Sequence, residues 1–142
     1  MDNTNITPIS LGIHKKSFAI DGDENRVIYL DPSDMGIMNR IDVFGKQIDE
    51  IIEKLKDVPV GELGARIIEV DGDMREAINN IFDYDVCSAC VPCGTMLDVL
   101  DGKFKFEIVV QALANVYTDT ISSEMKKVTT RMSAHTKKYI KK

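Results

Sequence analysis

Three cysteines lie close together in the segment Cys87-Ser-Ala-Cys90-Val-Pro-Cys93, with two consecutive Cys-x-x-Cys spacings. Thiolates three positions apart on a loop can converge on one metal ion or on an iron–sulfur cluster. A ferredoxin-type run also needs a fourth cysteine four positions after the third, and that position is occupied by Leu97. The spacing therefore indicates thiol chemistry without completing an iron–sulfur motif.

Two further kinds of thiol chemistry remain as alternatives for this segment. A structural zinc ion takes four ligands, and the two histidines, His14 and His135, are far from the cysteines in sequence, so a Cys3His site would need long-range convergence. A redox-active Cys-x-x-Cys opens a helix after a strand, and we predict no strand before this motif. The sequence favours three reduced thiols in a partly buried loop, with Cys87, Cys90 and Cys93 as metal ligands or redox groups as the alternatives. We therefore predict no cofactor.

The remaining residues do not form a recognisable catalytic set. The chain has no Gly-x-Gly-x-x-Gly, no phosphate-binding loop and no nucleophile elbow. The pieces Asp21-Gly22-Asp23 and Asp71-Gly72-Asp73 are much shorter than a calcium-binding loop, so we predict turns at both. We expect that this protein is not an enzyme.

Charge is distributed unevenly along the chain. The formal net charge is −5, but residues 126–142 contain seven basic side chains and no acidic one. Residues 1–125 contain 11 basic and 23 acidic side chains, a net charge of −12. An acidic body disfavours nucleic acid as the main partner, because phosphate binding needs a cationic surface.

Length and composition are those of one soluble domain. The chain has 142 residues, of which 44% are hydrophobic and 29% are charged. No apolar stretch approaches the length of a membrane span, so we expect no membrane association. We interpret residues 1–10 as polar, with no basic region before an apolar run. We therefore expect no export signal and a cytoplasmic location.

The first half of the chain predicts a β-hairpin and a helix. Residues 16–20 and 26–30 are rich in β-branched and aromatic side chains and are separated by turn formers, which predicts a hairpin. Asp31, before Pro32, suits a helix N-cap. Apolar residues then recur at helical spacing to about residue 56. The residues of this apolar stripe are Ile37, Ile41, Phe44, Ile48, Ile51 and Leu55.

The second half predicts further helices. Residues 57–64, with one proline and two glycines, predict a break, and residues 67–82 predict a second helix that the Asp-Gly-Asp piece at 71–73 can split. We expect irregular structure at 83–94, a helical turn at 95–100 and a last helix from about Phe104. The predicted fold is α+β and mostly helical, an N-terminal β-hairpin followed by three or four helices. We divide the chain into a flexible lead-in (1–15), a single α+β domain (16–125) and a basic C-terminal tail (126–142). The tail is either helical or a solvated, frayed terminus.

Residues 16–122 resemble the tail assembly chaperones of long-tailed phages and prophages of Firmicutes. The hairpin segment FAIDGDENRVIYL, residues 18–30, followed by an acidic turn and an amphipathic helix, is similar to the opening of those proteins. The segment AINNIFD, residues 77–83, is similar to the end of their second helix. The family then has Phe-Gly and an acidic, glycine-bearing loop, whereas here Phe82 is followed by Asp83-Tyr84-Asp85 and by the three cysteines.

The resemblance implies a specific role. Such chaperones bind the long, aggregation-prone tape measure protein in the host cytoplasm, bring tail tube subunits to it during tail morphogenesis, and are absent from the finished virion. Self-association is left open. Two alternatives remain: a small zinc-binding interaction module built on Cys87, Cys90 and Cys93, and a structural tail component retained in the particle.

Overall fold

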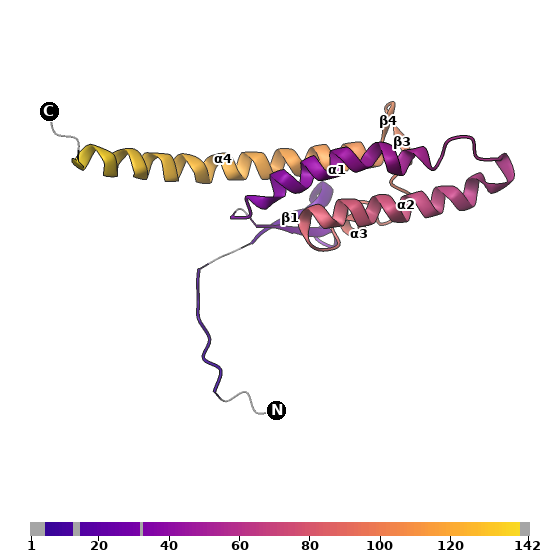
Figure 1. Cartoon of the computed structure of the whole chain (residues 1–142). Helices are drawn as coiled ribbons and strands as arrows, with labels where there is room; N and C mark the ends of the chain where they lie inside the picture. The colour runs from indigo at the N-terminus through magenta and orange to yellow at the C-terminus, as the bar shows by residue number, and fades with distance from the viewer. Residues whose placement is uncertain (1–4, 13–14, 32, 140–142) are drawn as a thin grey trace.

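The computed structural model describes residues 5–12, 15–31 and 33–139, and for residues 134–139 only the backbone. An N-terminal β-hairpin is followed by four helices, so the predicted α+β, mostly helical fold is confirmed. Two antiparallel helices, α1 (Gly36–Glu53) and α2 (Val60–Phe82), pack against each other (Figure 1). The first part of the long helix α4 (Lys105–Tyr139) contributes to the same core. These three helices and the hairpin enclose one hydrophobic core.

The N-terminal hairpin forms at the predicted positions. Strand β1 (Lys16–Ala19) pairs with β2 (Val27–Leu30), and Phe18 lies opposite Ile28. Ile28 and Leu30 are buried in the core, and Phe18 is half-buried against it. A two-stranded sheet is not stable alone, so this packing against the helices is what holds it. The Asp21-Gly22-Asp23 piece is a turn, as predicted, and its first two residues have positive φ angles of 53° and 75°.

Helix α1 carries the predicted apolar stripe but begins later than predicted. Ile37 and Phe44 are buried, and the other four members of the stripe are half-buried against the core. The predicted N-cap at Asp31 is wrong, because α1 begins at Gly36. The Asp31 carboxylate accepts hydrogen bonds from the Ser33 amide (2.9 Å) and hydroxyl (2.5 Å) instead, and so stabilises a turn that precedes the helix.

Helix α2 is longer than the sequence predicts. It begins at Val60, directly after Pro59, and continues through Gly61, Gly64 and Gly72. The predicted break therefore ends at residue 59, and the predicted turn at 71–73 is wrong. A glycine inside a helix costs about 1 kcal/mol relative to alanine. Here the apolar face of α2 offsets that cost by burial. Its buried residues are Val70, Met74, Ala77, Ile78, Ile81 and Phe82.

The segment between α2 and α4 contains three short elements that the sequence does not predict. A one-turn helix, α3 (Cys87–Cys90), lies in the stretch predicted to be irregular. The helical turn predicted at 95–100 is reduced to a single turn, in which the Asp98 amide donates to the Thr95 carbonyl oxygen at 3.2 Å. Residues 99–100 instead form strand β3 (Val99–Leu100), which makes a minimal hairpin with β4 (Lys103–Phe104). Asp101 and Gly102 join these strands with φ angles of 53° and 77°. Two consecutive positive φ angles are typical of a tight hairpin turn.

Helix α4 continues well past the body of the molecule (Figure 1). Phe106, Leu113 and Tyr117 are buried in the core, which confirms the predicted last helix. Residues 126–139, within the predicted basic tail, belong to this same helix. We call residues 122–139 of α4 the arm. Among the described residues, none of the helices is both long enough and apolar enough to cross a membrane.

Candidate functional site

The three cysteines lie at different depths in the segment around α3. Cys87 is buried, and its Sγ donates a hydrogen bond to the carbonyl oxygen of Arg75 at 3.6 Å. Burial raises the pKa of the Cys87 thiol to about 12. Burial also raises the pKa of the half-buried Cys90 thiol, whereas Cys93 is exposed. These surroundings favour neutral thiols at Cys87 and Cys90.

Neutral thiols at Cys87 and Cys90 are poorly suited to the redox alternative. Thiol–disulfide exchange uses the thiolate, which a raised pKa disfavours. Within the described ranges, no group of three or more His, Cys, Asp or Glu side chains is placed to hold a metal ion. His14 lies outside the described residues, and so does the side chain of His135.

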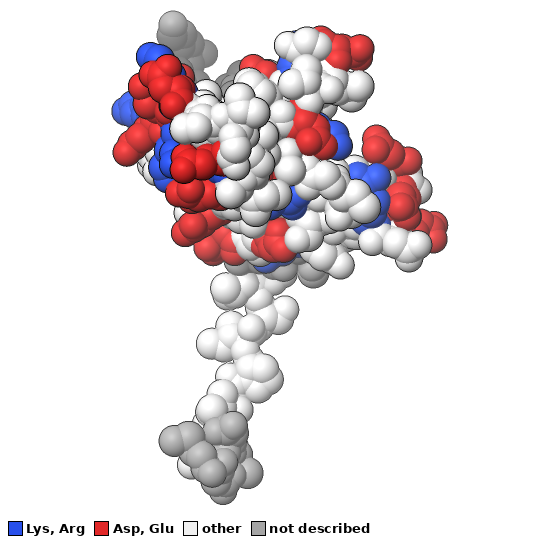
Figure 2. Space-filling view, turned by 90° about the vertical axis from the view of Figure 1, so that its right-hand side faces the viewer, with Lys and Arg blue, Asp and Glu red and all other residues white. Residues whose placement is uncertain are grey.

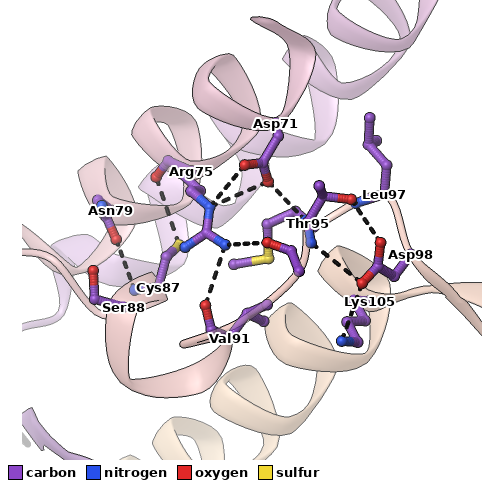
Figure 3. Close-up of polar contacts among 12 residues, drawn as sticks. Asp71, Arg75, Asn79, Cys87, Ser88, Val91, Thr95, Leu97, Asp98 and Lys105 are labelled. Atoms are coloured by element: carbon purple, nitrogen blue, oxygen red, sulfur yellow. Dashed lines mark hydrogen bonds and ion pairs between the residues drawn. The ribbon is translucent and has the colours of Figure 1, made fainter. Parts of the chain in front are cut away.

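An ion pair on α2 holds the end of the cysteine segment in place (Figure 3). Asp71 and Arg75 lie one turn apart on α2, and Arg75 Nε is 3.1 Å from both carboxylate oxygens. Arg75 Nη2 donates hydrogen bonds to the carbonyl oxygens of Val91 (3.1 Å) and Gly94 (3.2 Å). Asp71 accepts a further bond from the Met96 amide at 2.7 Å. The pair therefore ties the chain on both sides of Cys93 to α2.

A second set of polar side chains fixes the start of α3. Asn79 accepts hydrogen bonds from the backbone amides of Val86 (2.9 Å) and Cys87 (3.1 Å). Asp85 accepts bonds from the Ser88 amide (3.1 Å) and hydroxyl (2.6 Å), and these bonds lower the pKa of its carboxyl group. Because these contacts satisfy the free amides of a helix start, the polar residues near the cysteines have a structural explanation.

We expect the three thiols to react at three different rates with an Ellman-type reagent. Exposed Cys93 should react fast, and Cys90 should react more slowly because burial and a raised pKa both reduce its available thiolate. Cys87 should react only when the protein unfolds. Absorbance stopped flow should show one fast phase that Cys93→Ser removes. A fast phase that persists in Cys93→Ser would show that α3 opens in the native state.

Two projecting segments expose apolar side chains. Residues 5–12 extend away from the body and contain no charged residue, so they form an uncoloured strip in Figure 2. Ile6, Ile9 and Leu11 in this segment are 71%, 82% and 76% exposed. The interpretation of residues 1–10 as polar overlooked Ile6 and Ile9. On the arm, Met125 and Val128 are 44% and 42% exposed.

The stripe that packs α4 into the core continues onto the arm. Leu113 and Tyr117 are buried, Ile121 is half-buried, and Met125 and Val128 follow at helical spacing. Every described side chain from 125 to 133 is exposed. The basic residues Lys126, Lys127 and Arg131 flank this part of the stripe. The arm is therefore a basic amphipathic helix that leaves its apolar face in solvent.

A groove with an apolar floor lies at the other end of α4. Ile52, Leu55 and Phe104 form its floor, and its volume is about 620 Å³. The exposed residues Asp49, Glu53 and Lys56 complete the lining, and Lys56 pairs with Glu53 at 3.9 Å. Sequence reasoning missed this groove, because it depends on β4, which was not predicted.

Comparison with known proteins returns no similarity: no protein-family model, no curated protein and no solved structure matches this chain. A function is therefore argued from three features: the uncharged segment 5–12, the basic arm and the groove.

Proposed function

We propose that this protein is a phage tail assembly chaperone, which binds the tape measure protein and recruits tail tube subunits, and that it acts by binding and not by catalysis. The observation that carries the proposal is the uncharged segment 5–12, which holds three large apolar side chains in solvent. Exposed apolar groups of this kind mark interaction sites. They suit an aggregation-prone client, whose own apolar surface they would cover. The resemblance of residues 16–122 to the chaperone family supplies the identity of that client.

The charge of the body supports the same role. A chaperone that masks apolar client surface must keep the loaded complex in solution, and net charge provides the repulsion that does so. Residues 1–125 have a net charge of −12, and acidic side chains are spread over the face seen in Figure 2. We place this activity in the host cytoplasm, where tails are assembled.

The proposal is tested by co-expressing the chain with the tape measure protein of the same phage or prophage. We expect the tape measure protein to stay soluble and to co-purify with this chain. Replacing Ile6, Ile9 and Leu11 together by serine should weaken capture about tenfold, or roughly 1.4 kcal/mol, because the apolar contacts are lost. The free energy of unfolding should not change, since these side chains are exposed.

A matched control replaces three exposed apolar residues on the helices, Val43, Val60 and Ile68, by serine. This control should capture the client as well as the wild type. Equal loss of capture in both triple variants would contradict a role for segment 5–12. An insoluble client that does not co-purify with the wild-type chain would overturn the proposed function itself.

Two further measurements complete this test. Tail tube protein should join the complex only when the tape measure protein is present, as a pull-down with each protein alone and with both would show. The chain should be absent from purified virions by mass spectrometry. Detection in the particle at the copy number of a tail component would favour the structural alternative.

A further inference from the structure

We propose that copies of this chain associate head to tail, with the basic arm of one copy seated in the groove of the next. The two surfaces match in chemistry. The arm presents Met125 and Val128 beside basic side chains, and the groove presents apolar residues beside two carboxylates, of which Glu53 pairs with Lys56 and Asp49 supplies the excess negative charge. Opposite charges around apolar contacts steer association and fix its register.

The arm contains one acidic residue, Glu124, which already pairs within the arm. After Glu124 the sequence contains no acidic residue, and Glu124 pairs with Lys127 at 3.3 Å. A side-by-side dimer of two arms would therefore bring like charges together, which is unfavourable. The acidic complement lies on the body, and Asp49 and Glu53 place two of its carboxylates beside exposed apolar surface.

The β3–β4 hairpin adds apolar surface next to the groove. Val99 lies opposite Phe104 in the β3–β4 ladder, so its side chain is on the same face of that hairpin. Val99 is 67% exposed, whereas Leu100 pairs with Lys103 and lies on the other face of the hairpin. Val99 thus adds exposed apolar surface beside Phe104. A second copy would cover this otherwise exposed patch.

The geometry of α4 requires the contact to be intermolecular. Phe104, in the groove, immediately precedes α4, and Met125 lies 21 residues further along the chain. At about 1.5 Å per residue, a continuous helix places the arm about 30 Å from the groove of its own chain. Figure 1 shows β4 and the arm at opposite ends of α4. An arm that cannot fold back onto its own groove can reach only the groove of another copy.

A contact between two different surfaces repeats from copy to copy. It produces a ring if the rotation closes and an open chain if it does not. The contact involves a few turns of helix and one groove, so it is smaller than a stable interface of about 1,200–2,000 Å². We therefore expect reversible, concentration-dependent association. Screening by salt should weaken it, because exposed charge pairs are screened within about 10 Å.

The test is sedimentation velocity of the full-length chain over a range of concentrations. Wild-type protein should form species larger than a monomer at low salt and return towards monomer at high salt. Two charge reversals should each raise the apparent Kd at least about tenfold. The arm variant is Lys126→Glu with Lys127→Glu and Arg131→Glu, and the groove variant is Asp49→Lys with Glu53→Lys. An exposed control, Asp42→Lys with Asp119→Lys, should associate like the wild type.

The decisive sample is an equimolar mixture of the two reversed variants. Each variant alone joins like charges, whereas in the mixture an acidic arm meets a basic groove and a basic arm meets an acidic groove. We therefore expect the mixture to associate as the wild type does. A wild-type chain that stays monomeric at all concentrations would overturn the proposal, and so would association that survives both reversals or is not restored by mixing. None of these outcomes depends on client capture, so this proposal and the proposed function fail separately.

Discussion

We expect replacement of Tyr117 by alanine to lower the free energy of unfolding by about 3–5 kcal/mol. Tyr117 is fully buried, and with Phe106 and Leu113 it joins α4 to the rest of the core. Its hydroxyl donates a hydrogen bond to the carbonyl oxygen of Asp34, just before α1. The substitution removes a large aromatic side chain and leaves a cavity between these elements. The free energy of unfolding of a domain is about 5–15 kcal/mol, so this substitution removes a large part of it.

Two variants make this result interpretable. Tyr117→Phe keeps the ring and removes only the hydroxyl, so it should cost about 1 kcal/mol. Ile68→Ala removes an aliphatic side chain that is 66% exposed and should change stability by less than about 0.5 kcal/mol. Urea denaturation followed by circular dichroism measures all three. A cost for Tyr117→Ala no larger than that of Tyr117→Phe would show that the ring does not contribute to the core.

The second large effect is expected at the ion pair on α2. Replacing Arg75 by methionine should lower the free energy of unfolding by about 2–3 kcal/mol, because the Asp71 carboxylate and two backbone carbonyls lose their donor. This cost is below that of a fully buried pair, since the two side chains remain 24% and 14% exposed. Asp71→Asn keeps an acceptor for the Met96 amide and should cost less.

The structural consequence is local and can be followed directly. Without Arg75, the segment from Val91 to Met96 loses two of its hydrogen bonds to α2 and keeps the Asp71 bond and its apolar packing, so its amides should exchange faster with solvent. Hydrogen exchange with mass spectrometry should show this in Arg75→Met. The control is Arg66→Met, because Arg66 pairs with Glu69 at 3.4 Å in a more exposed setting and should contribute at most about 1 kcal/mol. Equal effects of the two substitutions would contradict the role assigned to Arg75.

The elements predicted correctly are those whose pattern is local. The alternation of residues 16–30 gives the hairpin, and the helical spacing of apolar residues gives α1 and the first part of α4. These patterns directly determine which face of each element is buried. The side chain of Asp31 was predicted to cap a helix, but it closes a turn before α1 instead. An aspartate side chain can do either, so the sequence does not distinguish the two.

The errors lie where distant residues decide the local structure. Gly64 and Gly72 favour a break, yet α2 continues through them because its other face is buried in the core. The β3–β4 hairpin has two-residue strands, too short for an alternation to be recognised. The cysteine spacing indicated thiol chemistry. The surrounding packing buries Cys87 and half-buries Cys90, which favours neutral thiols.

By itself, the sequence determined the fold class, the order of the main elements and the separation of an acidic body from a basic C-terminal end. These properties follow from periodicity and composition along the chain. Only the tertiary structure decided which apolar side chains are core and which are exposed, because one continuous stripe on α4 is buried up to Ile121 and exposed from Met125. It also created the groove, since Ile52 and Phe104 come together only when α1 and β4 pack side by side.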